Sequence, residues 1–252
     1  MSSSEDRQFV EALARGLAIL ETLSRAQRPL SNGILAKETG LAPSTVSRLT
    51  HTLSVLGYIR LMPGNRAYEL TAKNLTLGYP ILAGLSLIKR AQPVLKEISD
   101  QTGETAALAI RDGLHITFVD VNQGRNMVAV RLAMGGRLPI AVAAAGIALV
   151  AALPEKEQRS VGNRVRSYIT KRSGNVKGFD RYLQEAQENG LAVVRNAWRT
   201  GIGGVAIAVE SNGELAALTI PVATGSVSEA AMRGPLAQTL RDAARRLSDP
   251  EG

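Results

Sequence analysis

The chain has 252 residues, 45% of them hydrophobic, and a formal net charge of +8. This length allows one large domain or two of moderate size, and the basic balance favours a polyanionic partner such as nucleic acid. The lack of cysteine excludes disulfides, thiolate nucleophiles and cysteine-bound metals. The N-terminus has no apolar signal-peptide core, and the longest apolar run, residues 138–153, is too short and too rich in alanine for a membrane span. We therefore expect a cytoplasmic protein without a membrane partner.

Three predicted helices open the chain. Apolar spacing predicts a first helix over residues 9–25, with an inward stripe expected at Val10, Leu13, Ala14, Leu17 and Leu20. Residues 32–39 and 41–56 form two more helices separated by Gly40, and Ser31 can cap the earlier one. This is the layout of a helix-turn-helix, whose second helix enters the major groove of DNA.

The predicted helix over residues 41–56 has an apolar and a polar face. The apolar stripe, expected to pack inward, consists of Val46, Leu49, Leu53 and Leu56. The opposite face carries Ser44, Ser47, Arg48 and His51, and Thr45 lies near the N-terminus, where it can contact a phosphate. An arginine can make a bidentate contact to guanine, and histidine or serine can bond to base edges or phosphate. Taken alone, the pattern also suits an ordinary surface helix.

A predicted hairpin follows this helix. Gly57 is a natural helix stop, residues 58–61 and 67–70 are expected to be strands, and residues 62–66 form the turn. Three helices followed by a hairpin make a winged helix. Arg60, Asn65 and Arg66 can reach DNA phosphates or a minor groove. A lone basic turn is usually only solvated, but directly after a helix-turn-helix a DNA contact is the favoured interpretation.

The rest of the chain predicts an α+β domain. Residues 71–85 read as a helical connector broken at Gly78 and Pro80, followed by a helix up to Thr102. Period-two patterns predict strands over residues 106–110, 115–121, 127–132, 191–195, 203–209 and 215–222. Residues 135–139 are expected to be a loop, and helices are expected over residues 141–153 and 180–190 and near the C-terminus. The last helix is expected to open with a capping box at Ser226 and Glu229, and Asn212-Gly213 predicts a hairpin turn. The sheet should be mostly antiparallel, with helices packed on it.

An enzymatic second domain has little support in the sequence. The only histidines, His51 and His115, fall in different domains, and no Ser/His/Asp set or metal-ligand spacing is present. Residues 201–204 resemble a phosphate loop only superficially, because no Gly-Lys-Ser/Thr follows them. No catalytic residue, metal ligand or cofactor is predicted.

Several segments occur in the order found in one family: residues 15–20 (RGLAIL), 41–49 (LAPSTVSRL), 56–59 (LGYI), 102–106 (TGETA), 137–139 (RLP), 190–193 (GLAV) and 213–218 (GELAAL). On these residues the chain resembles the IclR family of bacterial transcriptional regulators. The resemblance implies a winged helix-turn-helix domain over residues 1–71, a linker helix over 72–85, and a GAF-like effector-binding and oligomerisation domain over 86–252. It also implies homodimers formed through the DNA-binding domain, and often a dimer of dimers.

The resemblance further implies an effector site between the sheet and the alanine-rich helix, where carboxylates are held by backbone amides at the helix start. The predicted effector-binding residues are Met134, Ala145, Gly146, Ile147, Asn196, Gly204 and Thr219. The family's Gly-Lys-Ala run reads Gly146-Ile147-Ala148 here, so the lysine is missing. The pocket is therefore expected to be more apolar and to suit an aromatic or larger acid. Candidate carboxylate partners are Arg131, Arg195 and Arg199, each of which could equally be a surface arginine.

We therefore expect a sequence-specific transcriptional regulator whose binding to a double-stranded DNA operator is modulated by a small organic acid. The alternative is a DNA-binding regulator whose C-terminal domain only oligomerises and binds no ligand.

Overall fold

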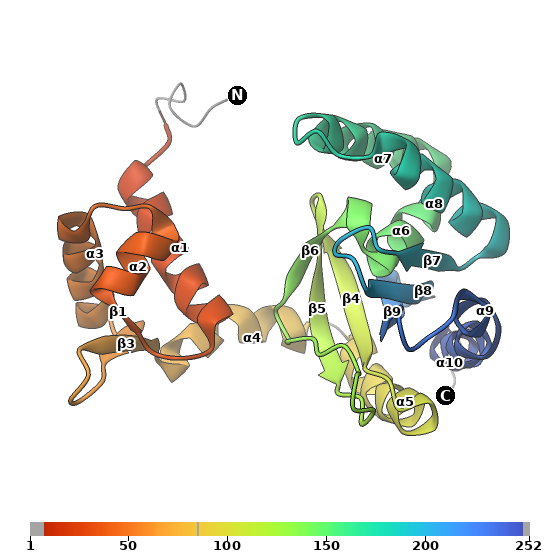
Figure 1. Ribbon diagram of the computed structural model, residues 1–252, viewed down its shortest axis with the longest axis horizontal. Helices are drawn as coiled ribbons and strands as arrows, with labels where there is room; N and C mark the ends of the chain where they lie inside the picture. The colour runs from red at the N-terminus through yellow and green to blue at the C-terminus, as the bar shows by residue number, and fades with distance from the viewer. Residues whose placement is uncertain (1–7, 85, 249–252) are drawn as a thin grey trace. The chain divides into compact units, whose positions relative to one another are not determined.

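The computed structural model describes residues 8–84 and 86–248 and divides the chain after Gly84 into two compact units (Figure 1). The predicted winged helix-turn-helix followed by an α+β domain is confirmed. No helix within the described residues is long and apolar enough to cross a membrane.

The first unit is built from three helices and a small sheet. The helices are α1 (Glu11–Ala26), α2 (Asn32–Thr39) and α3 (Pro43–Val55). The strands β1 (Leu30–Ser31), β2 (Ile59–Leu61) and β3 (Ala67–Leu70) pair antiparallel in the order β1-β3-β2. Ser31 caps α2 as predicted, because its hydroxyl accepts a hydrogen bond from the amide of Ile34 at 3.4 Å. The core of this unit joins all three helices to β2 and includes Ile19, Leu35, Val46, Leu53 and Ile59.

The inward face predicted for α1 is wrong at three of its five residues, whereas Leu20 packs against the core and Ala14 is partly buried. The side chains of Val10, Leu13 and Leu17 are 63%, 62% and 50% exposed. The buried face instead contains Gly16, Ile19 and Leu23. The helix therefore has two apolar stripes, and periodicity alone does not say which one meets the core.

The predicted break in the connector is also wrong. After a short 3₁₀ turn, η1 (Ala72–Asn74), helix α4 (Leu75–Ala83) runs without interruption through Gly78 and Pro80. A proline in a helix removes one backbone hydrogen bond, and here the carbonyl of Pro80 still accepts from the amide of Gly84 at 3.1 Å. None of the α4 side chains is buried.

A six-stranded antiparallel sheet organises the second unit. Its order is β6-β5-β4-β9-β8-β7. The strands are β4 (Ala106–Asp112), β5 (His115–Asn122), β6 (Arg137–Pro139), β7 (Ala192–Arg195), β8 (Ile202–Ser211) and β9 (Glu214–Ala223). Helices α6 (Ala144–Ala151), α7 (Glu155–Thr170) and α8 (Val176–Asn189) lie on one side, whereas α5 (Ser86–Thr102) and α10 (Ala237–Ser248) lie on the other (Figure 1). A short 3₁₀ turn, η2 (Ile140–Val142), precedes α6.

Two sequence predictions fail around the edge strand. Residues 127–132 form a turn and coil instead of a strand, and the strand next to β5 is β6, where a loop was expected. The chain leaves the sheet because the amides of Arg125 and Asn126 bond to the carbonyl of Gly103 at 2.9 and 3.0 Å. Gly124 makes this crossing possible, since a Cβ there would lie 2.6 Å from the backbone of Glu104.

The C-terminal segment departs from the expected capping box. Ser228, and not Ser226, caps α9 (Glu229–Ala231) by accepting from the amide of Ala231 at 3.1 Å. A π-helical turn, η3 (Met232–Leu236), contains Pro235 and separates α9 from α10.

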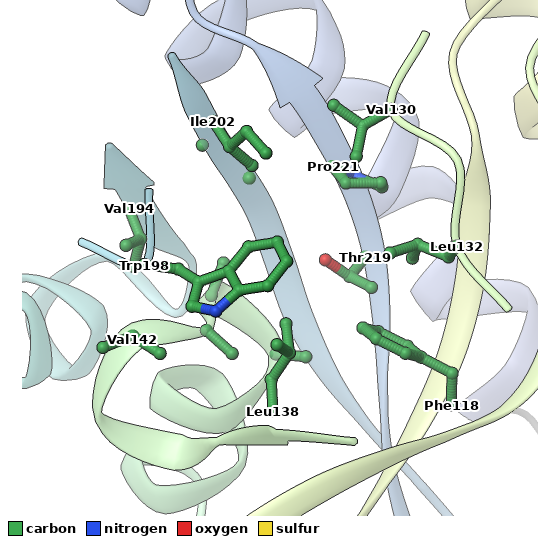
Figure 2. A pocket seen from close by; sticks show the side chains of 15 residues that line it. Phe118, Val130, Leu132, Leu138, Val142, Val194, Trp198, Ile202, Thr219 and Pro221 are labelled. Carbon is green, nitrogen blue, oxygen red and sulfur yellow. The ribbon is translucent and has the colours of Figure 1, made fainter. Parts of the chain in front are cut away.

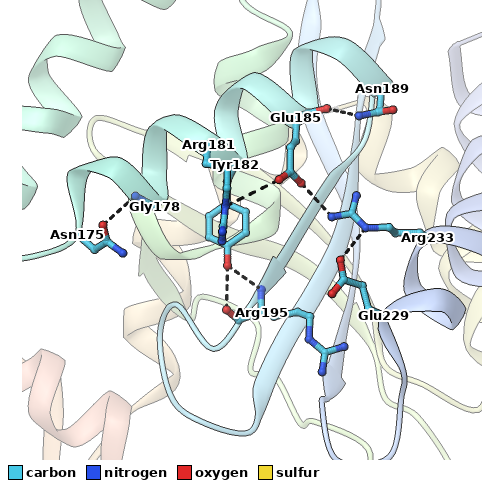
Figure 3. A network of polar contacts seen from close by, with 9 residues as sticks. All are labelled: Asn175, Gly178, Arg181, Tyr182, Glu185, Asn189, Arg195, Glu229 and Arg233. Atoms are coloured by element: carbon cyan, nitrogen blue, oxygen red, sulfur yellow. Dashed lines mark hydrogen bonds and ion pairs between the residues drawn. The ribbon is translucent and has the colours of Figure 1, made fainter.

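A polar network joins this segment to α8 and β7 (Figure 3). The Arg233 guanidinium bonds to Glu185 at 2.9 Å and to Glu229 at 2.8 Å, and its hydrogen bond lowers the pKa of Glu229. The hydroxyl of Tyr182 donates to the carbonyl of Arg195 at 3.0 Å. The strand β7 is thereby held against α8.

The long β8–β9 hairpin is fastened to the start of α5. Its turn at Asn212 and Gly213 has positive φ angles of 52° and 77°, as the Asn-Gly sequence predicts. The Glu214 carboxylate accepts from the amides of Ser86 at 3.1 Å and Leu87 at 2.9 Å. These are amides at a helix start, which have no carbonyl partner within the helix.

Candidate functional site

The exposed face of α3 carries the side chains predicted to read DNA. Ser44, Ser47, Arg48 and His51 are exposed, whereas Thr45 is partly buried. Arg48 forms no ion pair with any residue that the structure describes. Val46 and Leu53 are buried as predicted, but Leu56 is exposed because α3 ends one residue before it. The face offers hydroxyl, guanidinium and imidazole groups to a groove.

A buried threonine fixes α3 against α2. The hydroxyl of Thr50, which is fully buried, lies 3.2 Å from the side-chain oxygen of Asn32 and donates to the carbonyl of Val46 at 3.0 Å. The sequence analysis missed this contact. Its signal was the position of Thr50 within the apolar stripe between Val46 and Leu53.

The three predicted wing residues have different surroundings. Arg60 bonds to Glu69 on the neighbouring strand at 2.6 Å, so its charge is largely offset. The side-chain oxygen of Asn65 accepts from the amide of Ala67 at 3.2 Å and shapes the turn. Arg66 lies at the turn with a φ of 47° and is exposed, without an ion pair in the described part of the chain. Arg66 is therefore the wing side chain best placed for a phosphate.

A pocket opens in the second unit between the sheet and the start of α6 (Figure 2). Its empty space, including the part open to solvent, is about 520 Å³. The lining residues are Phe118, Val130, Leu132, Leu138, Val142–Ala145, Val194, Trp198, Ile202–Gly204, Thr219 and Pro221. Their only polar side-chain groups are the indole N–H of Trp198 and the hydroxyl of Thr219, which donates to the carbonyl of Val205 at 3.0 Å.

The start of α6 supplies the other polar groups. Ala143 caps the helix without a side-chain hydrogen bond, and Ala144 and Ala145 line the pocket. The first amides of a helix have no carbonyl of the preceding turn to bond to, and the helix dipole places partial positive charge there. This end of the pocket therefore suits an anionic group.

The structure brings together three of the seven predicted effector residues, Ala145, Gly204 and Thr219. The other four do not line the pocket. Met134 is exposed, and Ile147 is fully buried in the core. Gly146 faces η2, where a Cβ would lie 2.6 Å from Cα of Ile140. The side chain of Asn196 lies at the base of the β7–β8 loop and accepts from the amide of Gly201 at 2.8 Å.

None of the three candidate arginines lines the pocket. Val194 faces it, so Arg195, the next residue of β7, points to the opposite face of the sheet, where it contacts Met232 and Thr224. Arg131 is exposed, and Arg199 lies over the indole of Trp198 at 4.4 Å from the ring centre. The residue that sequence reasoning missed is Trp198, the only tryptophan in the chain.

His115 is the one histidine of the second unit. His115 packs edge-on against Tyr168, and burial lowers its pKa. Within the described residues, no three His, Asp or Glu side chains gather closely enough to hold a metal ion.

Comparisons with known proteins agree with this two-part organisation. Residues 12–62 match the family model described as the IclR helix-turn-helix domain, and residues 80–249 match that of the bacterial transcriptional regulator IclR C-terminal domain. The Pca regulon regulatory protein of Pseudomonas putida is 29% identical over 247 residues, which cover 96% of this chain and 84% of that protein.

Solved structures give the same result. An IclR family transcriptional regulator from Brucella abortus is 31% identical, with a TM-score of 0.71 over 97% of this chain and 93% of that one. An IclR homologue from Microbacterium hydrocarbonoxydans, solved in complex with 4-hydroxybenzoate, shares the fold at 21% identity, with a TM-score of 0.69 over 94% of this chain and 97% of that one. The chain is a DNA-binding transcriptional regulator and not an enzyme, and it belongs to the IclR family.

Proposed function

We propose that a small organic acid binds in the pocket beside α6 and modulates the binding of α3 to an operator. The single observation that carries this proposal is an apolar pocket lining that includes the first residues of α6, a helix start without a side-chain cap. A carboxylate at Ala144 and Ala145 leaves the apolar body of the acid beside Phe118 and Leu138. The Microbacterium relative, which was solved with an aromatic acid, supports this choice of ligand class.

On the DNA side, we propose that Arg48 reads a base edge and that Thr45 and Arg66 contact phosphates. The support is the exposure of Arg48 on α3 and of Arg66 on the wing, and the place of the partly buried Thr45 in the first turn of α3, whose opposite face is packed against the core. The place of action is then the cytoplasm, where bacterial DNA lies.

We also propose that the regulator acts as a homodimer that buries the exposed apolar stripe of α1. Leu13 and Leu17 lie four residues apart on α1, Phe9 and Val10 come directly before it, and all four are exposed apolar side chains. Two copies would present two α3 helices to half-sites about one DNA turn apart. Sedimentation should show that Leu13→Glu shifts dimer to monomer, whereas Ser24→Glu on an exposed polar position of α1 does not.

The second candidate is a regulator whose second unit binds no ligand. The observation that favours it is the absence of any charged side chain from the pocket lining. A thermal shift screen with aromatic and aliphatic acids separates the two functions. Effector binding predicts a concentration-dependent rise in melting temperature with at least one acid, and no rise with any acid would favour the second candidate.

A pocket-filling variant makes the screen specific. A Cβ at Gly204 would meet Ala144 Cβ and the carbonyl oxygen of Ile220 at 3.5 Å, both ordinary contacts, so Gly204→Ala is tolerated there and Gly204→Val adds two further methyl groups to this wall of the pocket. These variants should lose the ligand-induced shift. Gly225→Ala is the matched control, because a Cβ there has no neighbour within 4 Å.

A further inference from the structure

Trp198 forms part of the pocket wall. It lies on the loop between β7 and β8, and its indole is one of the side chains that line the cavity (Figure 2). The side chain is 41% exposed, so the ring has one part in the pocket and another in solvent. A ring in this position forms part of the pocket wall and can also control entry.

The loop that carries Trp198 is fixed at its base. The amide of Asn196 donates to the carbonyl of Ile202 at 2.8 Å, and the side chain of Asn196 accepts from the amide of Gly201 at 2.8 Å. The amide of Ile202 in turn bonds to the carbonyl of Arg199 at 3.1 Å. The backbone is therefore held at both ends, and the position of the indole depends mainly on its own side-chain torsions.

Arg199 lies over one face of the ring. Its guanidinium carbon lies 4.4 Å from the indole centre, and Arg199 itself does not line the cavity. A cation on one face leaves the other face free for a second planar partner. It also places positive charge close to the cavity, which favours an anionic ligand.

A second aromatic ring stands on a different wall. Phe118 comes from β5, and the hydroxyl of Thr219 on β9 is the remaining polar side-chain group of the lining (Figure 2). Aromatic pairs gain affinity beyond the area that they bury, and a saturated ring of equal size does not share this gain. Aromatic side chains of the pocket can therefore stack on the ring of a planar acid but not on that of a saturated acid.

Resting on the proposed effector function, we infer that Trp198 selects planar aromatic acids over saturated acids of the same size by stacking the ligand ring on its inner face. Trp198 is then the residue that sets the specificity of the regulator. The amides of α6 hold the carboxylate of either type of acid, so they contribute affinity without discrimination.

The test compares two matched pairs of acids on the full-length protein by calorimetry: benzoate with cyclohexanecarboxylate, and 4-hydroxybenzoate with 4-hydroxycyclohexanecarboxylate. The wild-type protein should bind the aromatic member about 2- to 10-fold more tightly. Trp198→Phe should keep this preference, whereas Trp198→Leu should lower the ratio clearly, to the part that Phe118 alone supplies. If Trp198→Leu keeps the wild-type ratio, the inference is overturned.

A second readout needs no variant. Trp198 is the only tryptophan in the chain, so intrinsic fluorescence reports on this ring directly. The aromatic acids should change its emission upon binding, and unchanged emission at saturating ligand would overturn the stacking. If the wild type bound both members of each pair with equal affinity, the role of Trp198 would be wrong and the proposed effector function would stand. If none of the four acids binds and the wider acid screen is also negative, the proposed effector function falls, and this inference falls with it.

Discussion

Helices α3 and α6 use their side chains in opposite ways. On α3, polar side chains at Ser44, Ser47, Arg48 and His51 are turned toward solvent, where a partner can contact them. On α6, every residue from Ala144 to Val150 is buried, and most side chains are small. What α6 can offer a ligand is its first amides and the space that its alanines leave open.

The groups that can bind a partner are therefore side chains at the α3 site and backbone amides at the α6 site. The α3 site depends on the identity of side chains, so substitutions there should alter binding and leave stability nearly unchanged. The α6 site depends on backbone position, so substitutions there should alter stability first.

Gly146→Ala should destabilise the protein by about 3 kcal/mol. The added methyl would lie 2.6 Å from Cα and 2.8 Å from the carbonyl oxygen of Ile140, and backbone atoms cannot rotate away. Urea unfolding measures the loss. Gly78→Ala in α4 is the matched control, because a Cβ there meets nothing within 4 Å and helix propensity predicts a gain of about 0.5–1 kcal/mol. If Gly146→Ala and Gly78→Ala changed the free energy of unfolding by the same amount, the close packing of α6 against Ile140 would be contradicted.

Arg48→Ala should cost about 1–3 kcal/mol of operator binding and relax specificity at one base position, if the arginine reads a guanine. Its melting temperature should stay close to that of the wild type, because Arg48 is exposed. Anisotropy titrations with a site selected from random DNA measure the loss. Arg66→Ala is the comparison variant and should weaken binding to all sequences alike. It should also lower the steepness with which the logarithm of the binding constant falls with the logarithm of salt concentration by about 1. If Arg48→Ala discriminated between DNA sequences as well as the wild type does, Arg48 would not read a base.

Glu214→Gln should lower the free energy of unfolding by about 0.5–1 kcal/mol. The start of α5 differs from that of α6 because a carboxylate already fills it, at 3.1 and 2.9 Å from the two amides. The amide side chain keeps the shape but loses the charge that complements the helix dipole. Glu210→Gln, an exposed position on the same hairpin, serves as the control in thermal unfolding. If both variants lose the same stability, the capping role is wrong.

A buried carboxyl group, that of Asp120, should make the stability of the protein depend on pH. Whereas Arg48 lies in solvent, Asp120 is buried on β5, and burial raises the pKa of its carboxyl above the ordinary value of 3.8. Between the unfolded and the raised folded pKa, the folded state keeps a proton that the unfolded state releases, so stability falls as pH rises. The stability of the wild type relative to Asp120→Asn should therefore decline as pH rises above the ordinary pKa of 3.8. A difference that does not vary with pH would contradict the raised pKa.

The first unit was predictable in most of its elements because its signals are local. A serine cap, a Gly40 stop and a polar turn between two strands define α2, α3 and the wing hairpin without reference to distant residues. The exposed stripe of α1 was misassigned because its apolar residues resemble core residues until their neighbours are known. The expected strand over residues 127–132 failed for a similar reason, since Gly124 takes the chain over the start of β4.

The pocket was less predictable from the sequence. A motif can identify the start of α6, but it does not say that Ala145 faces the cavity while Gly146 packs against Ile140. Nor does it show that Arg195 and Val194 point to opposite faces of β7. Trp198 lies outside every motif, and only the β7–β8 loop brings its ring to the pocket wall.

The most direct test measures operator affinity with and without an acid that the thermal shift screen identifies. Fluorescence anisotropy with a labelled duplex selected from random DNA gives both dissociation constants. Effector regulation predicts that saturating acid changes the constant by about 5- to 150-fold. Gly204→Val should abolish this change while keeping the ligand-free affinity. An acid that binds the protein and leaves the dissociation constant for the operator unchanged would contradict the account.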